Sequence, residues 1–200
     1  MSKGLPIIIS APSGTGKSTI CQRLLKLRKN LRYSVTCTTR EPRPGEADGK
    51  HYFFTDRDEF KRRIRGHEFI EWAMVHDHYY GVPRGPLEER LDRGLDVLLA
   101  IDVQGAQTIK RKYPESVLIF VLPPSLSTLK ERLQSRREAA ASLAKRLANS
   151  RGELGAAKNY DYLVVNDDLD KAVAQISSII TAESLRLSRR RQVDLDHLIR

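Results

Sequence analysis

The feature that most constrains this chain is a short glycine-rich loop near its N-terminus. Residues 11–19 read APSGTGKST, which fits the pattern G-x-x-x-x-G-K-[ST] except that alanine stands at the first glycine position. Gly14 and Gly16 allow the backbone to curl until its N–H groups point inward, which creates a concave anion site. In this pattern Lys17 reaches the β- and γ-phosphates of a nucleotide, and the Ser18 hydroxyl can ligate Mg²⁺. The loop therefore predicts a phosphate-binding site.

The residues on either side of the glycine-rich loop provide the context that this pattern requires. The apolar residues between positions 5 and 9 are typical of a buried parallel strand. After the loop, Ile20, Leu24, Leu25 and Leu27 recur at helical spacing. Strand, loop and helix follow in the required order, so the positive end of the helix dipole would face a bound anion. The competing interpretation is an ordinary glycine turn.

The composition is that of one domain with a buried core. A chain of 200 residues, 40% of them hydrophobic, is long enough to bury roughly 70% of its unfolded surface. No apolar run approaches the ~18–20 residues of a membrane span, and the N-terminus has too few apolar residues for a secretory signal. Cys21 and Cys37 show no metal-ligand spacing. We therefore expect a cytoplasmic protein without a membrane partner.

The chain is strongly basic, with 35 Lys and Arg against 25 Asp and Glu and a formal net charge of +10. This balance suits nucleic acids, anionic membranes or phosphorylated small molecules. The basic residues are spread along the chain except in the tail, where four arginines cluster: Arg186, Arg189, Arg190 and Arg191. Few aromatic residues lie among them, so a base-stacking platform is not indicated. We interpret the tail as solvated and expect no nucleic-acid partner.

Strand-like and helix-like patterns alternate over much of the chain. The predicted strands are residues 7–9, 97–101, 117–122 and 162–165. Helical patterns follow most of them, including 126–135 and 169–187. This alternation predicts an α/β fold whose parallel sheet is covered on both faces.

Two stretches depart from this alternation. Residues 34–93 are rich in turn signals, followed by the aromatic run 52–54 and a polar helix near 56–65. We predict that this region is an inserted lobe with its own small sheet. Residues 127–154 are rich in Arg and Ala and show no strand pattern.

The predicted lobe carries candidates for a second phosphate site. Arg40 and Arg43 flank Pro42, which stiffens their spacing. Two forked guanidinium groups held in this way suit a phosphate group separate from the one in the glycine-rich loop. The hydroxyls of Tyr52 and Tyr80 could complete such a site. The alternative is a set of surface arginines beside core tyrosines.

These blocks, with the loop APSGTGKS, the segment LLAIDVQGAQTIK and the late VVNDDLDKA, resemble the guanylate kinase family from about residue 5 to residue 183. The resemblance implies the fold of P-loop nucleoside monophosphate kinases and Mg²⁺-dependent phosphoryl transfer from ATP to GMP. It also implies one domain of four parts. These are a parallel-sheet core (1–33, 94–126 and 155–185), a GMP-binding lobe (34–93), a mobile lid (127–154) and a basic tail (186–200).

The resemblance also implies roles for individual residues. The GMP phosphate would be held by Arg40, Arg43, Tyr52 and Tyr80. Glu71 and Asp102 would accept hydrogen bonds from guanine, and the Thr36 hydroxyl would approach its O6 atom. The implied ATP-binding residues are Ser13, Gly14, Thr15, Gly16, Lys17, Ser18, Thr19, Asn166 and Asp167. The implied catalytic residues are Lys17 and the lid arginines Arg132, Arg136 and Arg146, with Ser18 as the Mg²⁺ ligand.

Elementary chemistry agrees with these roles. Guanine presents N–H donors at N1 and N2, which suit carboxylates, whereas adenine would leave a buried carboxylate unpaired. Such a site can discriminate by ~10⁴–10⁵. A phosphate monoester has its second pKa near ~6, so GMP needs no general base and none of the five histidines has to be catalytic. Asp102 ends a predicted strand, so an indirect Mg²⁺ role remains its alternative assignment.

The chain departs from the family pattern in places. Ala100 stands where members commonly carry an acid, and residues 136–146 lack the usual Gly-Thr and acidic run, which weakens the lid assignments. Val82 replaces a Ser or Thr whose hydroxyl can donate to guanine O6. Two other functions remain: a kinase of another phosphorylated acceptor such as a ribose bisphosphate, and a non-catalytic protein-binding module. Glu71 and Asp102 argue against the first, and the intact glycine-rich loop argues against the second.

Overall fold

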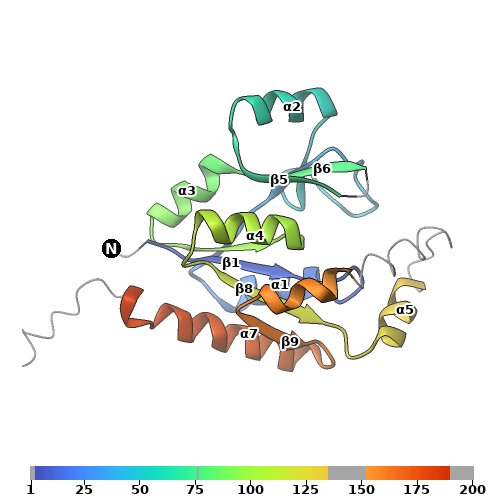
Figure 1. Ribbon diagram of the computed structural model, residues 1–200, viewed down its shortest axis with the longest axis vertical. Coiled ribbons are helices and arrows are strands. Elements are labelled where there is room, and N and C mark those ends of the chain that lie inside the picture. Colours follow the sequence, from blue (N-terminus) through green and yellow to red (C-terminus); the bar gives the residue numbers. More distant parts are fainter. Residues whose placement is uncertain (1–2, 76, 135–151, 190–200) are drawn as a thin grey trace, which may run out of the picture.

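The computed structural model describes residues 3–75, 77–134 and 152–189. Its core is a parallel sheet, which in the described residues has five strands in the order β2-β7-β1-β8-β9 (Figure 1). Every pairing in this sheet is parallel. The strands are β1 (Pro6–Ser10), β2 (Leu31–Tyr33), β7 (Asp96–Ala100), β8 (Val117–Leu122) and β9 (Tyr162–Val165). The predicted α/β fold class is confirmed.

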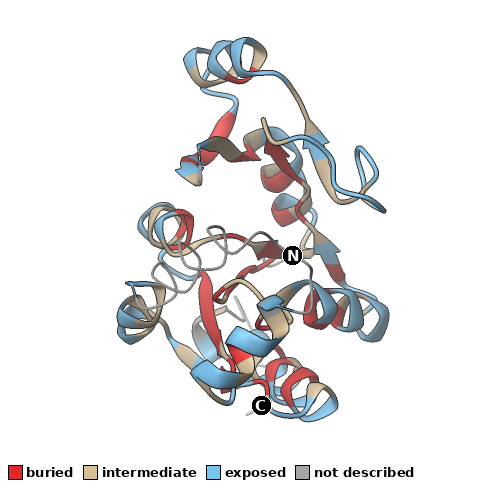
Figure 2. Cartoon of the chain, turned by 90° about the vertical axis from the view of Figure 1, so that its right-hand side faces the viewer, coloured by how far each residue is buried: buried red, intermediate tan, exposed pale blue. Residues whose placement is uncertain are grey.

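Both faces of this sheet are covered by helices, because successive side chains of a strand point to opposite faces. Ile7 and Ile9 pack on the side of α1 (Lys17–Leu27) and α7 (Leu169–Ser184), whereas Ile8 belongs to the cluster on the other side. That second cluster includes residues of α3 (Arg84–Asp92) and α4 (Val103–Lys112). In Figure 2 the buried residues follow the strands and the helix sides that face them. This double cover explains why the strands read as continuous apolar runs.

The predicted element boundaries hold with small shifts. The strands expected at 117–122 and 162–165 have those bounds, whereas the strand expected at 97–101 is Asp96–Ala100. Helix α5 is Leu126–Gln134, and α7 ends at Ser184 before a short 3₁₀ turn, Leu187–Arg189. Leu27 was expected on the core face of its helix, but its side chain is 61% exposed in the last turn of α1. In the part of the chain that the structure describes, no helix is long and apolar enough to cross a bilayer.

The region 34–93 forms a second sheet with the order β4-β3-β6-β5 (Figure 1). Its elements are β3 (Thr36–Thr38), β4 (Tyr52–Phe54), α2 (Arg57–Arg65), β5 (Phe69–Val75) and β6 (His78–Pro83). Phe60 of α2 stacks on Phe69 of β5, with ring centroids 4.5 Å apart, above the buried Cys37. Asp56 caps α2 by accepting a 2.8 Å hydrogen bond from the backbone N–H of Glu59. The lobe therefore has a small core of its own.

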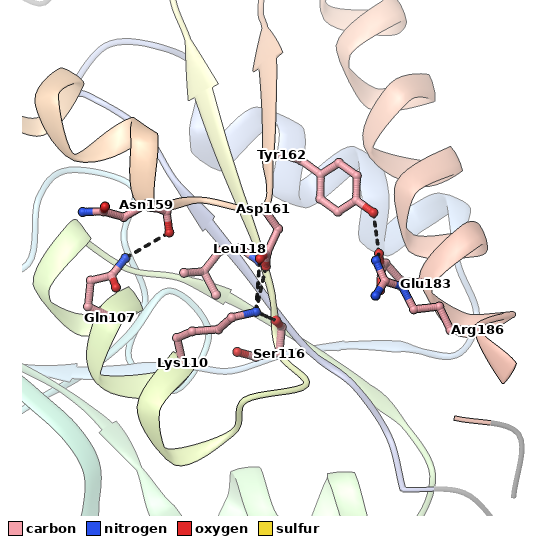
Figure 3. Close-up of polar contacts among 9 residues, drawn as sticks. All are labelled: Gln107, Lys110, Ser116, Leu118, Asn159, Asp161, Tyr162, Glu183 and Arg186. Carbon is pink, nitrogen blue, oxygen red and sulfur yellow. Dashed lines mark hydrogen bonds and ion pairs between the residues drawn. The ribbon is translucent and has the colours of Figure 1, made fainter. Parts of the chain in front are cut away.

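A polar cluster lies at the end of the core sheet where β8 and β9 begin, and it fixes the chain just before β9 (Figure 3). The ammonium of Lys110 in α4 donates to the Ser116 carbonyl at 2.6 Å and to the Asp161 carboxylate at 2.9 Å. Asp161 also accepts a 2.8 Å hydrogen bond from the backbone N–H of Leu118 in β8. These bonds tie α4, β8 and the start of β9 together. The short 3₁₀ turn that precedes β9, Ala157–Asn159, is held by Gln107 of α4, whose side-chain amide donates to the Asn159 carbonyl at 3.4 Å (Figure 3).

Candidate active site

A cleft lies at the carboxyl ends of β1 and β7, which is the usual position for a ligand in a parallel α/β sheet. The glycine-rich loop, the region 34–93, the end of β7 and one residue near the end of the predicted lid all contribute to its wall. The lining residues are Ala11, Pro12, Ser13, Gly14, Gly16, Lys17, Ser18, Thr19, Thr36, Arg40, Arg43, Tyr52, Glu71, Ala73, Val75, Tyr80, Ala100, Ile101, Asp102 and Glu153.

The glycine-rich loop has the backbone conformation that its glycines predict. Gly14 and Gly16 have φ angles of 89° and 99°, in the left-handed region that favours glycine. Gly16 is the N-cap of α1 and supplies no side chain to cap the first turn. The free N–H groups of a helix N-terminus and its dipole then face the cleft, which suits an anion.

Two predicted residues support this loop from behind. The buried Asn166 donates from its side-chain amide to the Thr15 carbonyl at 2.7 Å, and Arg132 reaches the same oxygen at 3.4 Å. A Cβ atom on Gly16 would lie 2.7 Å from the Asn166 amide nitrogen, so this close packing requires a glycine. Asn166 and Arg132 therefore contact the loop, and neither lines the cleft.

Lys17 lies where the loop meets the end of β7. Its ammonium donates to the Ile101 carbonyl at 3.3 Å. Burial lowers the pKa of Lys17, and the nearby Asp102 and Glu153 oppose this shift. Removal from water makes the ammonium an effective electrostatic partner for a phosphate that enters the cleft.

The buried residue Glu71 also lines the cleft. Glu71 is 5% exposed. Burial, reinforced by the neighbouring charge of Asp102 and opposed by Lys112, raises the pKa of Glu71 to about 8. A Cβ atom on Gly105 would lie 2.8 Å from a Glu71 carboxyl oxygen, so the glycine in the first turn of α4 makes this approach possible. Asp102 caps the same helix, accepting from the Gly105 N–H at 2.8 Å.

The four candidate phosphate residues meet at the cleft, where strand pairing brings Tyr52 and Tyr80 together and the loop after β3 carries Arg40 and Arg43. Strand β3 lies between β4 and β6, so Thr36 pairs with Tyr52 of β4 and Thr38 pairs with Tyr80 of β6. The Tyr52 and Tyr80 rings meet edge to face, with centroids 6.1 Å apart. The Arg40 guanidinium lies 5.4 Å from the centre of the Tyr52 ring. Arg43 completes this group in the cleft wall.

Several sequence candidates do not reach the cleft. Thr15 is fully buried beneath the loop, and Asp167 is exposed outside the cleft. Arg136 and Arg146 lie outside the described residues. Val82 is the direct cross-strand partner of Glu71, but it is fully buried in the core cluster and does not line the cleft. The structure therefore does not bring Val82 to the position that we expected beside the base.

Glu153 is a cleft residue that the sequence did not indicate. Burial raises the pKa of its carboxyl group, Asp102 adds to the shift and Lys17 opposes it. No local pattern distinguishes this glutamate from the other charged residues around it. Glu153 reaches the cleft because the chain returns past Lys17 before it enters β9. Lys17, Asp102 and Glu153 thus line the same cleft and interact electrostatically with one another.

Comparisons with known proteins show a family to which this chain is similar over nearly its whole length. The family model described as guanylate kinase matches residues 3–183. A guanylate kinase of Caldanaerobacter subterraneus subsp. tengcongensis is 47% identical over 194 residues, which cover 96% of this chain and 94% of the relative. The guanylate kinase of Escherichia coli strain K12 is 47% identical over 195 residues, with the same two coverages. Among solved structures, the guanylate kinase of Anaplasma phagocytophilum superposes with a TM-score of 0.81 at 38% identity, covering 100% of this chain and 95% of that one.

Proposed function

Since the chain belongs to the guanylate kinase family, we propose that its cleft holds ATP and GMP with their phosphates facing each other for direct phosphoryl transfer. The reaction is the conversion of ATP and GMP to ADP and GDP. The observation that carries the residue assignments is the composition of the cleft wall, which joins a phosphate-binding loop to an arginine pair and a buried carboxyl group. Neither alternative function is favoured, because full-length relatives share the guanylate kinase name.

We assign the ATP phosphates to the glycine-rich loop. The backbone N–H groups around Gly14 and Gly16 and the N-terminus of α1 would cradle them. Lys17 would move from the Ile101 carbonyl to the transferred phosphoryl group, where its charge stabilises the transition state. Asn166 and Arg132 would act indirectly, by holding the Thr15 carbonyl and hence the shape of the loop.

We assign the GMP phosphate to Arg40, Arg43, Tyr52 and Tyr80. Guanidinium groups bind phosphate through paired hydrogen bonds, and the tyrosine hydroxyls can add further donors. This group and the glycine-rich loop line the same cleft, so the attacking phosphate oxygen of GMP would face the γ-phosphoryl group of ATP. Catalysis then rests on alignment and on neutralised charge, because the GMP phosphate is already largely dianionic near pH 7.

We assign guanine to the space beside Glu71, Thr36 and Asp102. An ionised Glu71 would accept hydrogen bonds from the N1–H and N2–H donors of guanine. Adenine has no such donor at N1 and would leave the buried carboxylate unpaired. The Thr36 hydroxyl would serve O6, since Val82 does not reach the cleft. Asp102 already accepts from the Gly105 N–H, so its other oxygen is the one that faces the ligand.

The donor set of the cleft fits Mg²⁺, which prefers oxygen ligands and keeps much of its coordination to phosphates and water. Ser18, Asp102 and Glu153 all line the cleft and carry side-chain oxygen atoms. The described residues contain no group of three His, Cys, Asp or Glu side chains that could hold a metal ion alone. We therefore propose that Ser18 and the nucleotide phosphates hold Mg²⁺ together. When bound, Mg²⁺ neutralises charge on the transferred phosphoryl group.

A coupled assay of ADP release tests the proposal. The purified chain would be given ATP and Mg²⁺ with GMP, AMP, CMP, UMP or ribose phosphates as the acceptor. We expect kcat/KM for GMP to exceed that for AMP by ~10⁴ or more, because guanine presents adjacent N1–H and N2–H donors to the buried carboxylate and adenine does not. Comparable values for GMP and AMP would overturn the guanine assignment.

A further inference from the structure

One carboxylate lies behind the two arginines of the proposed GMP phosphate site. The Arg40 guanidinium donates from one nitrogen to both carboxylate oxygens of Glu46, at 2.9 and 2.8 Å. The backbone N–H of Arg43 donates to the same carboxylate at 2.8 Å. Glu46 does not line the cleft, whereas Arg40 and Arg43 do. A single side chain outside the cleft therefore contacts both arginines that face into it.

The Glu46 contacts restrict the guanidinium of Arg40 to one place. Its carbon lies 5.4 Å from the centre of the Tyr52 ring and 6.0 Å from that of the Phe54 ring, and a further nitrogen donates to the Glu41 carbonyl. A long arginine side chain otherwise loses conformational entropy when it binds a ligand, and a preorganised one has less to lose.

A second ion pair in the same lobe shows that this one is not an ordinary surface contact. The side chains of Arg40 and Glu46 are 12% and 18% exposed, whereas those of Arg62 and Glu59 in α2 are 70% and 34% exposed. Exposed pairs contribute little because water and salt screen them. Removing one partner of a shielded pair leaves the other without its hydrogen bonds. The Arg40–Glu46 pair therefore constrains its members far more than the Arg62–Glu59 pair does.

The charge of Glu46 is retained at neutral pH. Burial opposes ionisation, but hydrogen bonds from the Arg43 N–H and from Arg40 lower the pKa of Glu46 below its usual value. The loop is held further by the Glu46 N–H, which donates to the Arg43 carbonyl at 2.9 Å. The carboxylate and its backbone thus close the turn that carries Arg43.

We propose that Glu46 is a positioning residue for the acceptor phosphate, acting through Arg40 and through the turn at Arg43. The inference rests on the proposed function, in which these two arginines hold the phosphate of GMP. Glu46 would increase affinity for GMP without touching it, by presenting both arginines in the binding geometry before the ligand arrives.

Steady-state kinetics of two variants test this role. Glu46→Ala removes all three hydrogen bonds and should raise KM for GMP about tenfold, as expected for the loss of charge-assisted hydrogen bonds. Glu46→Gln keeps the shape and one acceptor oxygen, so its KM for GMP should be intermediate. In both variants KM for ATP should stay within about twofold of the wild-type value. Glu59→Ala is the matched control, because it breaks the exposed ion pair of the same lobe, and it should leave both constants unchanged.

A double-mutant cycle separates positioning from general destabilisation. In an Arg40→Ala background, Glu46→Ala should raise KM for GMP by much less than tenfold, because its main partner is absent. Equal effects in both backgrounds, an equal rise in KM for ATP, or an unchanged KM for GMP in Glu46→Ala would overturn the inference. If Arg40→Ala itself leaves KM for GMP unchanged, the proposed phosphate site is wrong, and the role of Glu46 fails with it. Thermal unfolding followed by circular dichroism checks that each variant is folded, and Glu46→Gln keeps the test valid if Glu46→Ala is not.

Discussion

Replacing Glu71 with glutamine is expected to abolish a pH dependence of GMP binding that the wild-type chain should have. Burial first, and the charge of Asp102 second, raise the pKa of Glu71 to about 8 against the opposing effect of Lys112. In the free protein this carboxyl group is therefore mostly protonated at pH 7. The N1–H and N2–H donors of guanine require the ionised form. Binding of GMP should consequently expel a proton from Glu71.

The expected size of the effect follows from that pKa. With a pKa of about 8, about one tenth of the molecules carry an ionised Glu71 at pH 7 and about three quarters at pH 8.5. The apparent Kd is the intrinsic value divided by the competent fraction. The affinity for GMP should therefore rise about eightfold between these two pH values and level off above pH 8.5. The phosphate of GMP, with a pKa near ~6, is already largely dianionic over this range and adds little.

Isothermal titration calorimetry measures both the affinity and the proton. Wild-type and Glu71→Gln proteins would be titrated with GMP at pH 7 and pH 8.5, each in two buffers of different ionisation enthalpy. The wild type should release about 0.9 protons per GMP at pH 7, whereas Glu71→Gln should bind more weakly at pH 8.5 and release none. Titration with ATP is the control, since ATP is assigned to the glycine-rich loop and not to Glu71. An equal pH dependence in Glu71→Gln, or no proton release by the wild type, would refute the reasoning.

Three further substitutions test the assignments on the two sides of the cleft. Lys17→Ala should lower kcat by at least about a hundredfold in a folded protein, because it removes a charge from the transferred phosphoryl group; a retained kcat would contradict the catalytic role. Arg43→Ala should raise KM for GMP at least about tenfold more than KM for ATP, and equal changes would show that the lobe is misassigned. Asn166→Ala removes the 2.7 Å hydrogen bond to the Thr15 carbonyl and should weaken ATP binding about tenfold with little change in KM for GMP. An effect of Asn166→Ala on GMP alone would place this residue with the acceptor instead.

The local sequence was sufficient to predict the core strands and the glycine-rich loop. The residues at 117–122 read as a strand because both faces are buried, so every side chain is apolar. Gly14 and Gly16 predicted the left-handed backbone of the loop because glycine alone adopts it without strain. Such features depend on residues that are close together in the chain, so a short sequence pattern is enough to predict them.

The roles of the insert and of the lid residues were predicted from the family resemblance, and the fold decided which of these residues reach the cleft. Val82 has the right sequence position for a base contact, but its side chain faces the core cluster. Asn166 supports the loop from behind, whereas we had expected it beside the nucleotide. No sequence pattern indicated that Glu153 lines the cleft, because only the path of the chain into β9 brings this residue to Lys17.

The electrostatic character of the site depends entirely on tertiary structure. Glu71 has the same composition and charge as any glutamate in the printed sequence. Its pKa departs from the ordinary range because the fold removes Glu71 of β5 from water and places Asp102 and Lys112, at the two ends of α4, nearby. Similarly, Glu46 and Glu59 have the same side chain. They differ because the fold shields the Arg40–Glu46 ion pair from water and leaves the Arg62–Glu59 pair exposed. Backbone conformation is set by local residue chemistry, whereas solvation and charge pairing are set by residues far apart in the chain.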